Sequence, residues 1–283
     1  MPVTVTGGIR TRYEMTGDGP PLLLFSPGGF DAQLENWSDL SSYAGLGLLP
    51  ALAARYTCIS FDRRESGQSG GRVQRLGWND YVTQAIDLLD QLGIAAAHLM
   101  GGCVGCSSVV ATAVAAPSRV LSMVLYSPAG GPRYRMKQHA RFATHAAFVE
   151  EHGLAAVVER ARSHEKGFTQ DPCVGPWAGE IRRERDFAEH YTRLDRGRYL
   201  VTISGTARVL FDRDTVPGAE PEDLMLLDHP ALIVPGEDDS HAPSAAHYLR
   251  ECLTGAEYWD LRVAQRSAAN APNRVLEFLD GTS

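Results

Sequence analysis

The fold is decided by residues 98–110, which read His98-Leu99-Met100-Gly101-Gly102-Cys103-Val104-Gly105-Cys106-Ser107-Ser108-Val109-Val110. An apolar run ends at Met100, small residues fill the next positions, and a helix of small residues follows. Gly101, Cys103 and Gly105 have the Gly-x-nucleophile-x-Gly spacing of a tight turn from a strand into a helix. A Cβ at either glycine would clash in such a turn. The central residue lies at a helix N-terminus, which favours an anion, so Cys103 is the candidate nucleophile.

Two other interpretations of this stretch remain open. Free cysteine is often core material, so Cys103 could simply fill the turn. Cys103 and Cys106 also form a C-x-x-C pair at a helix start, where thiol oxidoreductases keep their redox cysteines. Zinc is disfavoured because the chain has no second Cys or His pair at ligand spacing. We expect Cys106, one turn into the helix, to be a core residue.

Composition limits the class of protein. A chain of 283 residues with 44% hydrophobic content can bury a large core. Its net charge of −7 argues against nucleic acid or an anionic membrane as a partner. Five scattered cysteines do not resemble a disulfide framework, and no signal or membrane-spanning segment is evident. We expect a cytoplasmic protein with a small-molecule substrate and neither cofactor nor metal. A homodimer is compatible with this composition.

Short apolar strands alternate with helical patterns along most of the chain. This alternation is typical of a parallel sheet with helices on both faces, an α/β fold. Besides an N-terminal hairpin over residues 3–15 and the strand that leads into the turn at Cys103, the expected strands are 22–25, 56–61, 122–126, 231–235 and 257–261. The expected helices outside the middle of the chain are 80–92, 244–253 and 274–279, together with the helix that follows Cys103.

The middle of the chain has a different composition. From Gly131 to Asp228, charged residues and histidines become dense, and helical periodicity dominates from Arg141 to Arg162. We interpret residues 131–228 as a helical cap inserted between two core strands. Residues 1–130 and 229–283 would then form the core.

Taken together, these motifs resemble the α/β-hydrolase superfamily over nearly the whole chain. The matching residues are Gly17-x-Gly19-Pro20, Gly28-Gly29, Asp62-x-Arg64 with Gly67-x-Ser69, Gly101–Gly105, Pro117-x-Arg119-Val120 and Gly236-x-x-Asp239. The resemblance implies a mostly parallel central sheet with an active site under the cap. A cysteine nucleophile is similar to that of the dienelactone-hydrolase branch.

The resemblance also implies an oxyanion hole and a catalytic acid. The N–H of Val104 would supply one oxyanion donor, and the loop Gly28-Gly29-Phe30 would supply the other, with Gly29 and Phe30 as our candidates. Asp239 matches the position of the triad acid. Asp238 is the adjacent alternative.

The expected base is missing from its usual place. In the superfamily a histidine follows the last strand, but residues 263–272 contain none, and the nearest positional match, Gln265, cannot act as a base. His241, just past the acid, is our candidate replacement. The alternatives are a cap histidine, His139 or His145, or no base at all.

Three classes of function follow from these residues. The first is a cysteine hydrolase of an ester, thioester or activated C–C bond in a small molecule. The second is a non-hydrolytic enzyme on the same fold, such as a lyase, cyclase or acyl transferase. The third is a catalytically silent binding protein. Fold alone does not choose among them.

Overall fold

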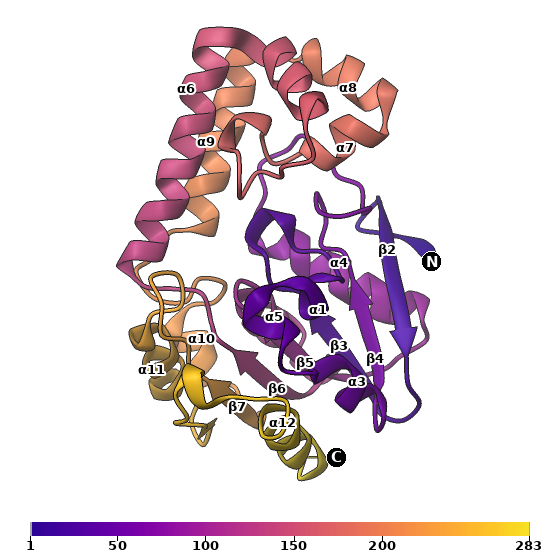
Figure 1. The fold of residues 1–283 in the computed structure, drawn as a ribbon, viewed down its shortest axis with the longest axis vertical. Coiled ribbons are helices and arrows are strands. Elements are labelled where there is room, and N and C mark those ends of the chain that lie inside the picture. Colours follow the sequence, from indigo (N-terminus) through magenta and orange to yellow (C-terminus); the bar gives the residue numbers. More distant parts are fainter. Residues whose placement is uncertain (1, 283) are drawn as a thin grey trace.

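The computed structural model describes residues 2–282 and contains an eight-stranded, mostly parallel sheet (Figure 1). The strand order is β1-β2-β4-β3-β5-β6-β7-β8. β2 runs antiparallel to both β1 and β4, and all other neighbours are parallel. The predicted α/β fold is therefore confirmed. The strands are β1 (Val3–Thr6), β2 (Ile9–Thr16), β3 (Pro21–Phe25), β4 (Thr57–Phe61), β5 (Ala97–Gly102), β6 (Val120–Tyr126), β7 (Ala231–Val234) and β8 (Glu257–Tyr258).

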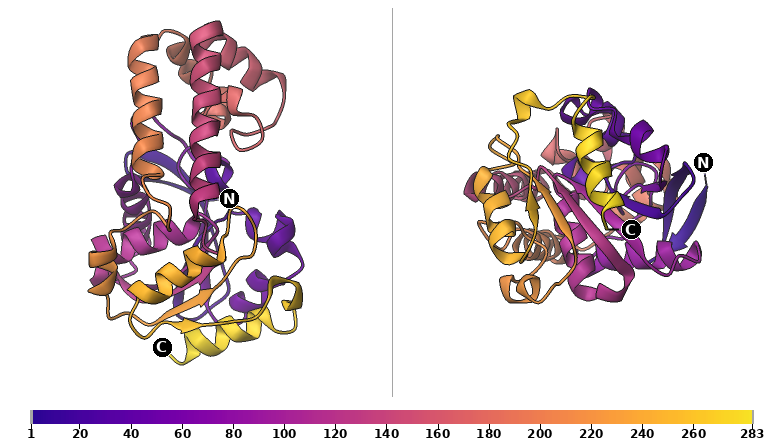
Figure 2. Two further views of the ribbon diagram at one scale, coloured as in Figure 1. Left: turned by 90° about the vertical axis from the view of Figure 1, so that its left-hand side faces the viewer. Right: turned by 90° about the horizontal axis from the view of Figure 1, so that it is seen from below.

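Helices cover both faces of the sheet, because the central strands are apolar on both sides. One face packs on α4 (Trp78–Gln91), α5 (Gly105–Ala115) and α11 (Pro243–Cys252). The other packs on α1 (Asn36–Asp39), α2 (Ser41–Ala44), α3 (Leu48–Ala53) and α12 (Ala271–Asp280). The view from below in Figure 2 shows α12 lying across the strands.

A second helical layer lies between β6 and β7 in the sequence and beside the sheet in space (Figures 1 and 2). Its helices are α6 (Pro132–Ser163), α7 (Ala178–Arg183), α8 (Arg185–Thr192) and α9 (Arg196–Leu210). α6 and α9 stand side by side, and α6 is interrupted at Gly153, whose φ is 79°. This layer has its own apolar cluster, which includes the fully buried Trp177. No helix among residues 2–282 is long and apolar enough to cross a membrane.

The structure differs from the sequence expectations at three element ends. α6 begins at Pro132, well before residue 141, because Gly131 at φ 101° allows the turn and proline suits a first helical position. β8 has only two residues. The segment after α9 returns to the core before residue 228, since Val216 packs in the cluster of α4, α5 and α11, as does Leu224 of the short helix α10 (Pro221–Met225).

Candidate active site

The predicted elbow forms where β5 meets α5. Cys103 has a φ of 56°, a left-handed conformation that non-glycine residues rarely adopt. The two flanking glycines are needed for close packing. A Cβ on Gly101 would lie 2.5 Å from the carbonyl carbon of Gly105, and one on Gly105 would lie 2.2 Å from the carbonyl oxygen of Phe25. The turn is held by the Cys103 N–H, which donates to the Tyr126 carbonyl at 3.1 Å.

His241 reaches Cys103 from the loop that follows β7. Its Nδ1 is bonded to Asp238, and its Nε2 is buried with no hydrogen-bond partner among the described residues. That nitrogen is therefore free to interact with the sulfur. Burial raises the pKa of the Cys103 thiol, but the charge of His241 and a hydrogen bond from it outweigh burial, so the pKa lies below its usual range. Burial lowers the pKa of His241, but Cys103 and Asp238 together raise it to about 9. The pair therefore favours a thiolate and an imidazolium.

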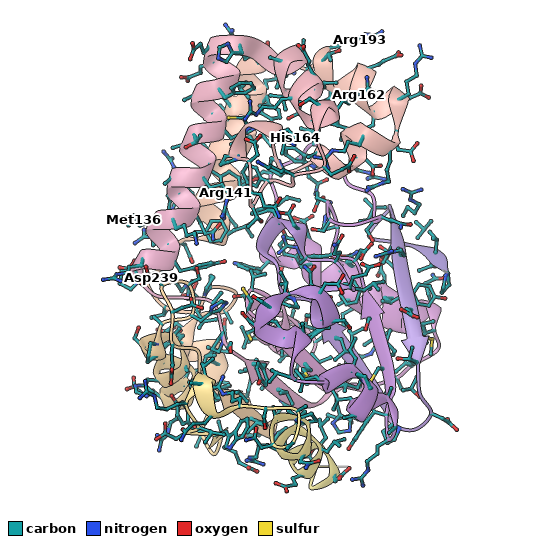
Figure 3. The ribbon with its side chains drawn as sticks, in the orientation of Figure 1. Met136, Arg141, Arg162, His164, Arg193 and Asp239 are labelled. Atoms are coloured by element: carbon teal, nitrogen blue, oxygen red, sulfur yellow. The ribbon has the colours of Figure 1, made fainter. Side chains whose placement is uncertain are left out.

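Asp238, rather than Asp239, is the acid that contacts His241. Its Oδ2 lies 2.8 Å from Nδ1 of His241. Asp239 is instead 70% exposed and forms an ion pair with Arg133 at the start of α6. Figure 3 shows Asp239 at the outer edge of the molecule. Of the two aspartates considered from the sequence, the structure places Asp238, and not Asp239, against the histidine, because the loop turns so that only the first of the two carboxylates faces it.

Two backbone N–H groups surround the sulfur, those of Val104 and Gly28, and both lower the pKa of the Cys103 thiol. The N–H of Val104 is the donor that the sequence led us to expect. The second donor comes from Gly28, whose φ of 123° turns the loop, and a Cβ there would lie 2.2 Å from Nδ2 of Asn36. Gly29 lines the adjoining cavity, whereas the ring of Phe30 is buried among the rings of the helical layer. Within this loop it is the N–H of Gly28, and not that of the expected Gly29 or Phe30, that interacts with the sulfur.

The other histidines are engaged elsewhere. Nε2 of His139 bonds to the Phe211 carbonyl at 2.9 Å. Nε2 of His145 shares a 2.6 Å hydrogen bond with the Tyr199 hydroxyl, and burial lowers the pKa of His145 to about 4. Neither histidine lines the cavity at Cys103.

The C-terminal loop, where the superfamily keeps its base, does not supply a substitute. Gln265 is exposed. Its neighbour Arg266 points inward, with its guanidinium 5.8 Å from the ring centres of both Tyr126 and Trp259. A small cavity of about 70 Å³ lies between Arg266 and the loop of Asp238 and His241.

Cys106 lies in the core, as expected, and is not placed for redox pairing. Its thiol donates to the Gly101 carbonyl at 3.1 Å. Burial raises its pKa well above the usual value. The pKa values of the two cysteines of the C-x-x-C sequence are thus shifted in opposite directions, downward for Cys103 and upward for Cys106.

Asp62, from the matching Asp-x-Arg motif, has a structural role. It forms a buried ion pair with Arg12, whose Nε lies 2.7 Å from its Oδ2. It also accepts hydrogen bonds from the N–H groups of Leu34 and Gln68. The carboxylate therefore ties the loop after β4 to β2 and to the loop after β3.

A cavity of about 320 Å³ opens on Cys103. One wall is the loop that holds Gly28, and the opposite wall is α6. The α6 residues in the wall are Tyr134, Lys137, Gln138 and Arg141. None of these was identified from the sequence, although their spacing of three and four residues is the signature of a single helix face. Within residues 2–282 no cluster of side chains suited to a metal ion is found.

Two curated relatives resemble part of the chain. The dihydrolipoyllysine-residue acetyltransferase component of the acetoin cleaving system of Cupriavidus necator is 37% identical over 123 residues, which is 44% of this chain and 30% of that protein. A putative carbamate hydrolase of Azorhizobium caulinodans is 30% identical over 125 residues, 44% of this chain and 43% of that protein. The matched region thus spans less than half the length of these relatives.

Solved structures resemble the whole fold. A meta-cleavage product hydrolase from Pseudomonas fluorescens has a TM-score of 0.62 and 20% identity, covering 100% of this chain and 98% of that one. An enol-lactonase from Burkholderia xenovorans has a TM-score of 0.62 and 19% identity, covering 99% of this chain and 100% of that one. At these identities the likeness concerns the fold.

The family follows from the sequence match and the topology together. Residues 21–250 match the α/β-hydrolase fold family. This range contains the elbow at Cys103 and the loop that places Asp238 and His241. The chain belongs to the α/β-hydrolase fold family.

Proposed function

We propose that this protein is a cysteine hydrolase that cleaves an ester, a thioester or an activated C–C bond of a small organic molecule. The observation that carries the proposal is the chain of contacts from Cys103 to His241 to Asp238, beside the backbone N–H groups of Val104 and Gly28. A nucleophile, a base, an orienting acid and two oxyanion donors are the parts that acyl transfer requires.

The first half of the reaction starts from the thiolate. The Cys103 sulfur attacks the carbonyl carbon, and the developing oxyanion accepts hydrogen bonds from Val104 and Gly28. When the bond to the leaving group breaks, the imidazolium of His241 gives that group its proton. The products of this half are the protonated leaving group, an acyl thioester on Cys103 and a neutral imidazole.

The second half uses the same histidine as a base. Once Cys103 is acylated, the thiolate charge that raised the pKa of His241 is gone, while burial, which lowers it, remains. The neutral imidazole therefore accepts a proton from water, and the resulting hydroxide attacks the thioester carbonyl. The thiolate leaves, and the carboxylic acid product is released.

We also propose that α6–α9 act as a cap over this reaction. Four residues of α6 line the cavity at Cys103, so the helical layer limits which molecules reach the sulfur. Exclusion of water by such a layer strengthens the electrostatic interactions inside the site. The role agrees with the position of the layer beside the carboxyl end of β5 (Figure 1).

Mass spectrometry of the intact protein with p-nitrophenyl acyl esters tests the proposal. We expect nitrophenolate release with turnover, and a transient acyl increment on Cys103 that is absent in Cys103→Ala. Cys173→Ala is the matched control, because Cys173 is a free, partly exposed cysteine outside the site. An acyl-enzyme that never turns over would favour an acyl transferase or lyase. Absence of acylation would favour a binding protein. Either result would overturn hydrolysis.

A further inference from the structure

The α6 wall of the cavity carries an arginine that is hydrogen-bonded to no carboxylate of the described residues, although Asp31 lies within electrostatic reach of it. Arg141 on α6 is 8% exposed and lines the cavity. Its Nη1 donates to Oε1 of Gln138, and its Nη2 donates to the Thr169 carbonyl at 3.2 Å. Both acceptors are neutral. No carboxylate of residues 2–282 forms an ion pair with Arg141, although most buried charges in proteins are paired.

Lys137 adds a second cation one helical turn away. It is exposed and lines the same cavity, so positions 137 and 141 present two positive charges on one face of α6. Figure 3 shows Arg141 on the side of α6 that is turned toward the core. A buried guanidinium with a flexible ammonium at the rim matches the fork geometry and charge of a carboxylate.

The cavity contains one carboxylate, Asp31, among its described lining residues. That carboxylate is occupied by the loop before α7: its Oδ2 accepts a hydrogen bond from the Thr169 N–H at 2.9 Å. The Cys103 thiolate balances the imidazolium of His241, so the cations of the cavity that set its net charge are Lys137 and Arg141, against the one carboxylate of Asp31. The site is therefore positive in a chain whose net charge is −7, which draws anionic small molecules toward it.

A second buried guanidinium lies behind the wall. Arg63 is 8% exposed, and its Nε and Nη2 are buried without a hydrogen-bond partner among the described residues. It stacks on the rings of Phe30 and Tyr81, at 5.1 Å and 4.7 Å. Tyr134, which lines the cavity, is within electrostatic reach of Cys103, Arg63 and Arg141. Arg63 also lies within electrostatic reach of the buried carboxyl of Glu65, so its charge is directed at that group as well as at Tyr134.

We infer that the substrate carries a carboxylate, separate from the carbonyl that Cys103 attacks, and that Arg141 binds it with help from Lys137. This inference rests on the proposed function and narrows its substrate class to acyl compounds with a second, anionic end. A buried guanidinium that is already held by Gln138 and Thr169 is oriented before the substrate arrives, so little ordering is needed on binding.

A matched pair of esters tests the inference. Mono-p-nitrophenyl glutarate and p-nitrophenyl pentanoate differ only by a carboxylate in place of a methyl group at the far end of the acyl chain. We expect the wild-type protein to acylate Cys103 faster with the glutarate ester. In Arg141→Gln the glutarate-to-pentanoate rate ratio should fall about ten- to a hundredfold, the scale of a lost hydrogen bond to a charged group, and Arg141→Lys should restore part of it.

Arg162→Gln is the matched control, because Arg162 is an exposed arginine of α6 outside this cavity (Figure 3). The glutarate-to-pentanoate rate ratio of Arg162→Gln should equal that of the wild type. A purely structural role of Arg141 would lower both rates together and leave the ratio unchanged, which would overturn the inference. So would a wild type that accepts both esters equally, and in that case the hydrolase proposal itself would stand.

A second measurement does not depend on hydrolysis. Glutarate should protect Cys103 from iodoacetamide in the wild type but not in Arg141→Gln. The neutral diamide glutaramide should protect Cys103 in neither protein. If no ester acylates Cys103, the hydrolase proposal fails and this protection alone decides whether the cavity binds a carboxylate. Equal protection by the acid and the diamide, or none, would overturn the inference.

Discussion

Nδ1 of His241 lies 2.8 Å from Oδ2 of Asp238, three residues earlier in the same loop. Oδ1 of Asp238 also accepts hydrogen bonds from the N–H groups of Ser240, at 2.7 Å, and His241, at 3.0 Å. The loop is anchored beside β6 by the Gly130 N–H, which donates to the Ser240 carbonyl at 3.0 Å. One turn therefore places both Asp238 and His241, so the proposed acid and base need no residue of the C-terminal loop.

The two neighbouring aspartates offer a matched test of this arrangement. Asp238→Asn should lower ester turnover by a hundredfold or more, because a neutral amide neither stabilises the imidazolium nor fixes the tautomer of His241. Asp239→Asn removes an exposed ion pair with Arg133 and should change turnover by no more than about twofold. Steady-state hydrolysis of one activated ester by both variants gives the comparison. Equal losses would contradict the assignment of Asp238.

His241→Ala should separate the two halves of the reaction. With an activated ester the leaving group needs no proton, so the variant should still acylate Cys103, more slowly because less thiolate is present. Deacylation should slow by about a hundredfold or more, the usual contribution of a general base. A mass increment on Cys103 should then accumulate during turnover. A variant that turns over like the wild type would show that His241 is not the base.

The fold could be predicted because its signals are local. The apolar runs that form β3, β4, β6 and β7 alternate with helical patterns, and the glycines around Cys103 predict the tight turn between β5 and α5. Element ends were less accurate where tertiary packing decides them. β8 shrinks to two residues at a sheet edge, and Val216 joins the core although the composition around it resembles the helical layer.

The site could be predicted only in part. The sequence singled out Cys103 and His241 because few residue types do this chemistry, and the structure brings the two together. The choice between Asp238 and Asp239 depends on a loop conformation that composition does not encode. Arg141 was missed for a different reason. Its sequence context is a charged helix face, and only the packing of α6 against the core shows that this arginine is buried.

Gly101→Ala should destabilise the protein by about 1–3 kcal/mol or more, the cost of overpacking. The new methyl would meet the backbone of Gly105 and Cys106 at 2.5–2.6 Å, and backbone atoms cannot turn aside as a side chain can. Gly45→Ala is the control, since a Cβ there meets nothing within 4 Å. Urea denaturation of the two variants measures the difference. A Gly101→Ala variant as stable as Gly45→Ala would contradict the tight elbow.

The pH dependence of Cys103 alkylation follows from the two shifted pKa values. The pKa of the Cys103 thiol lies below its usual range, so the reactive thiolate is present above that lowered value and is lost as the pH falls through it. The pKa of His241 is raised to about 9, so its imidazolium persists up to that pH and is lost above it. The rate of alkylation by iodoacetamide should therefore rise as the pH passes the lowered pKa of Cys103 and then stay level. It should change a second time near pH 9, where His241 loses its proton.

His241→Ala provides the decisive comparison for this profile. Burial raises the pKa of the Cys103 thiol, and in the variant the charge of His241 no longer opposes it. The rise in alkylation rate should move to higher pH by at least one unit, the size expected for loss of a neighbouring opposite charge. Cys58 serves as an internal reference, because burial raises its pKa to about 12 and it should stay unmodified at neutral pH. A profile that is unchanged in the variant would mean that the helix N-terminus and the N–H groups of Val104 and Gly28 hold the thiolate without the histidine.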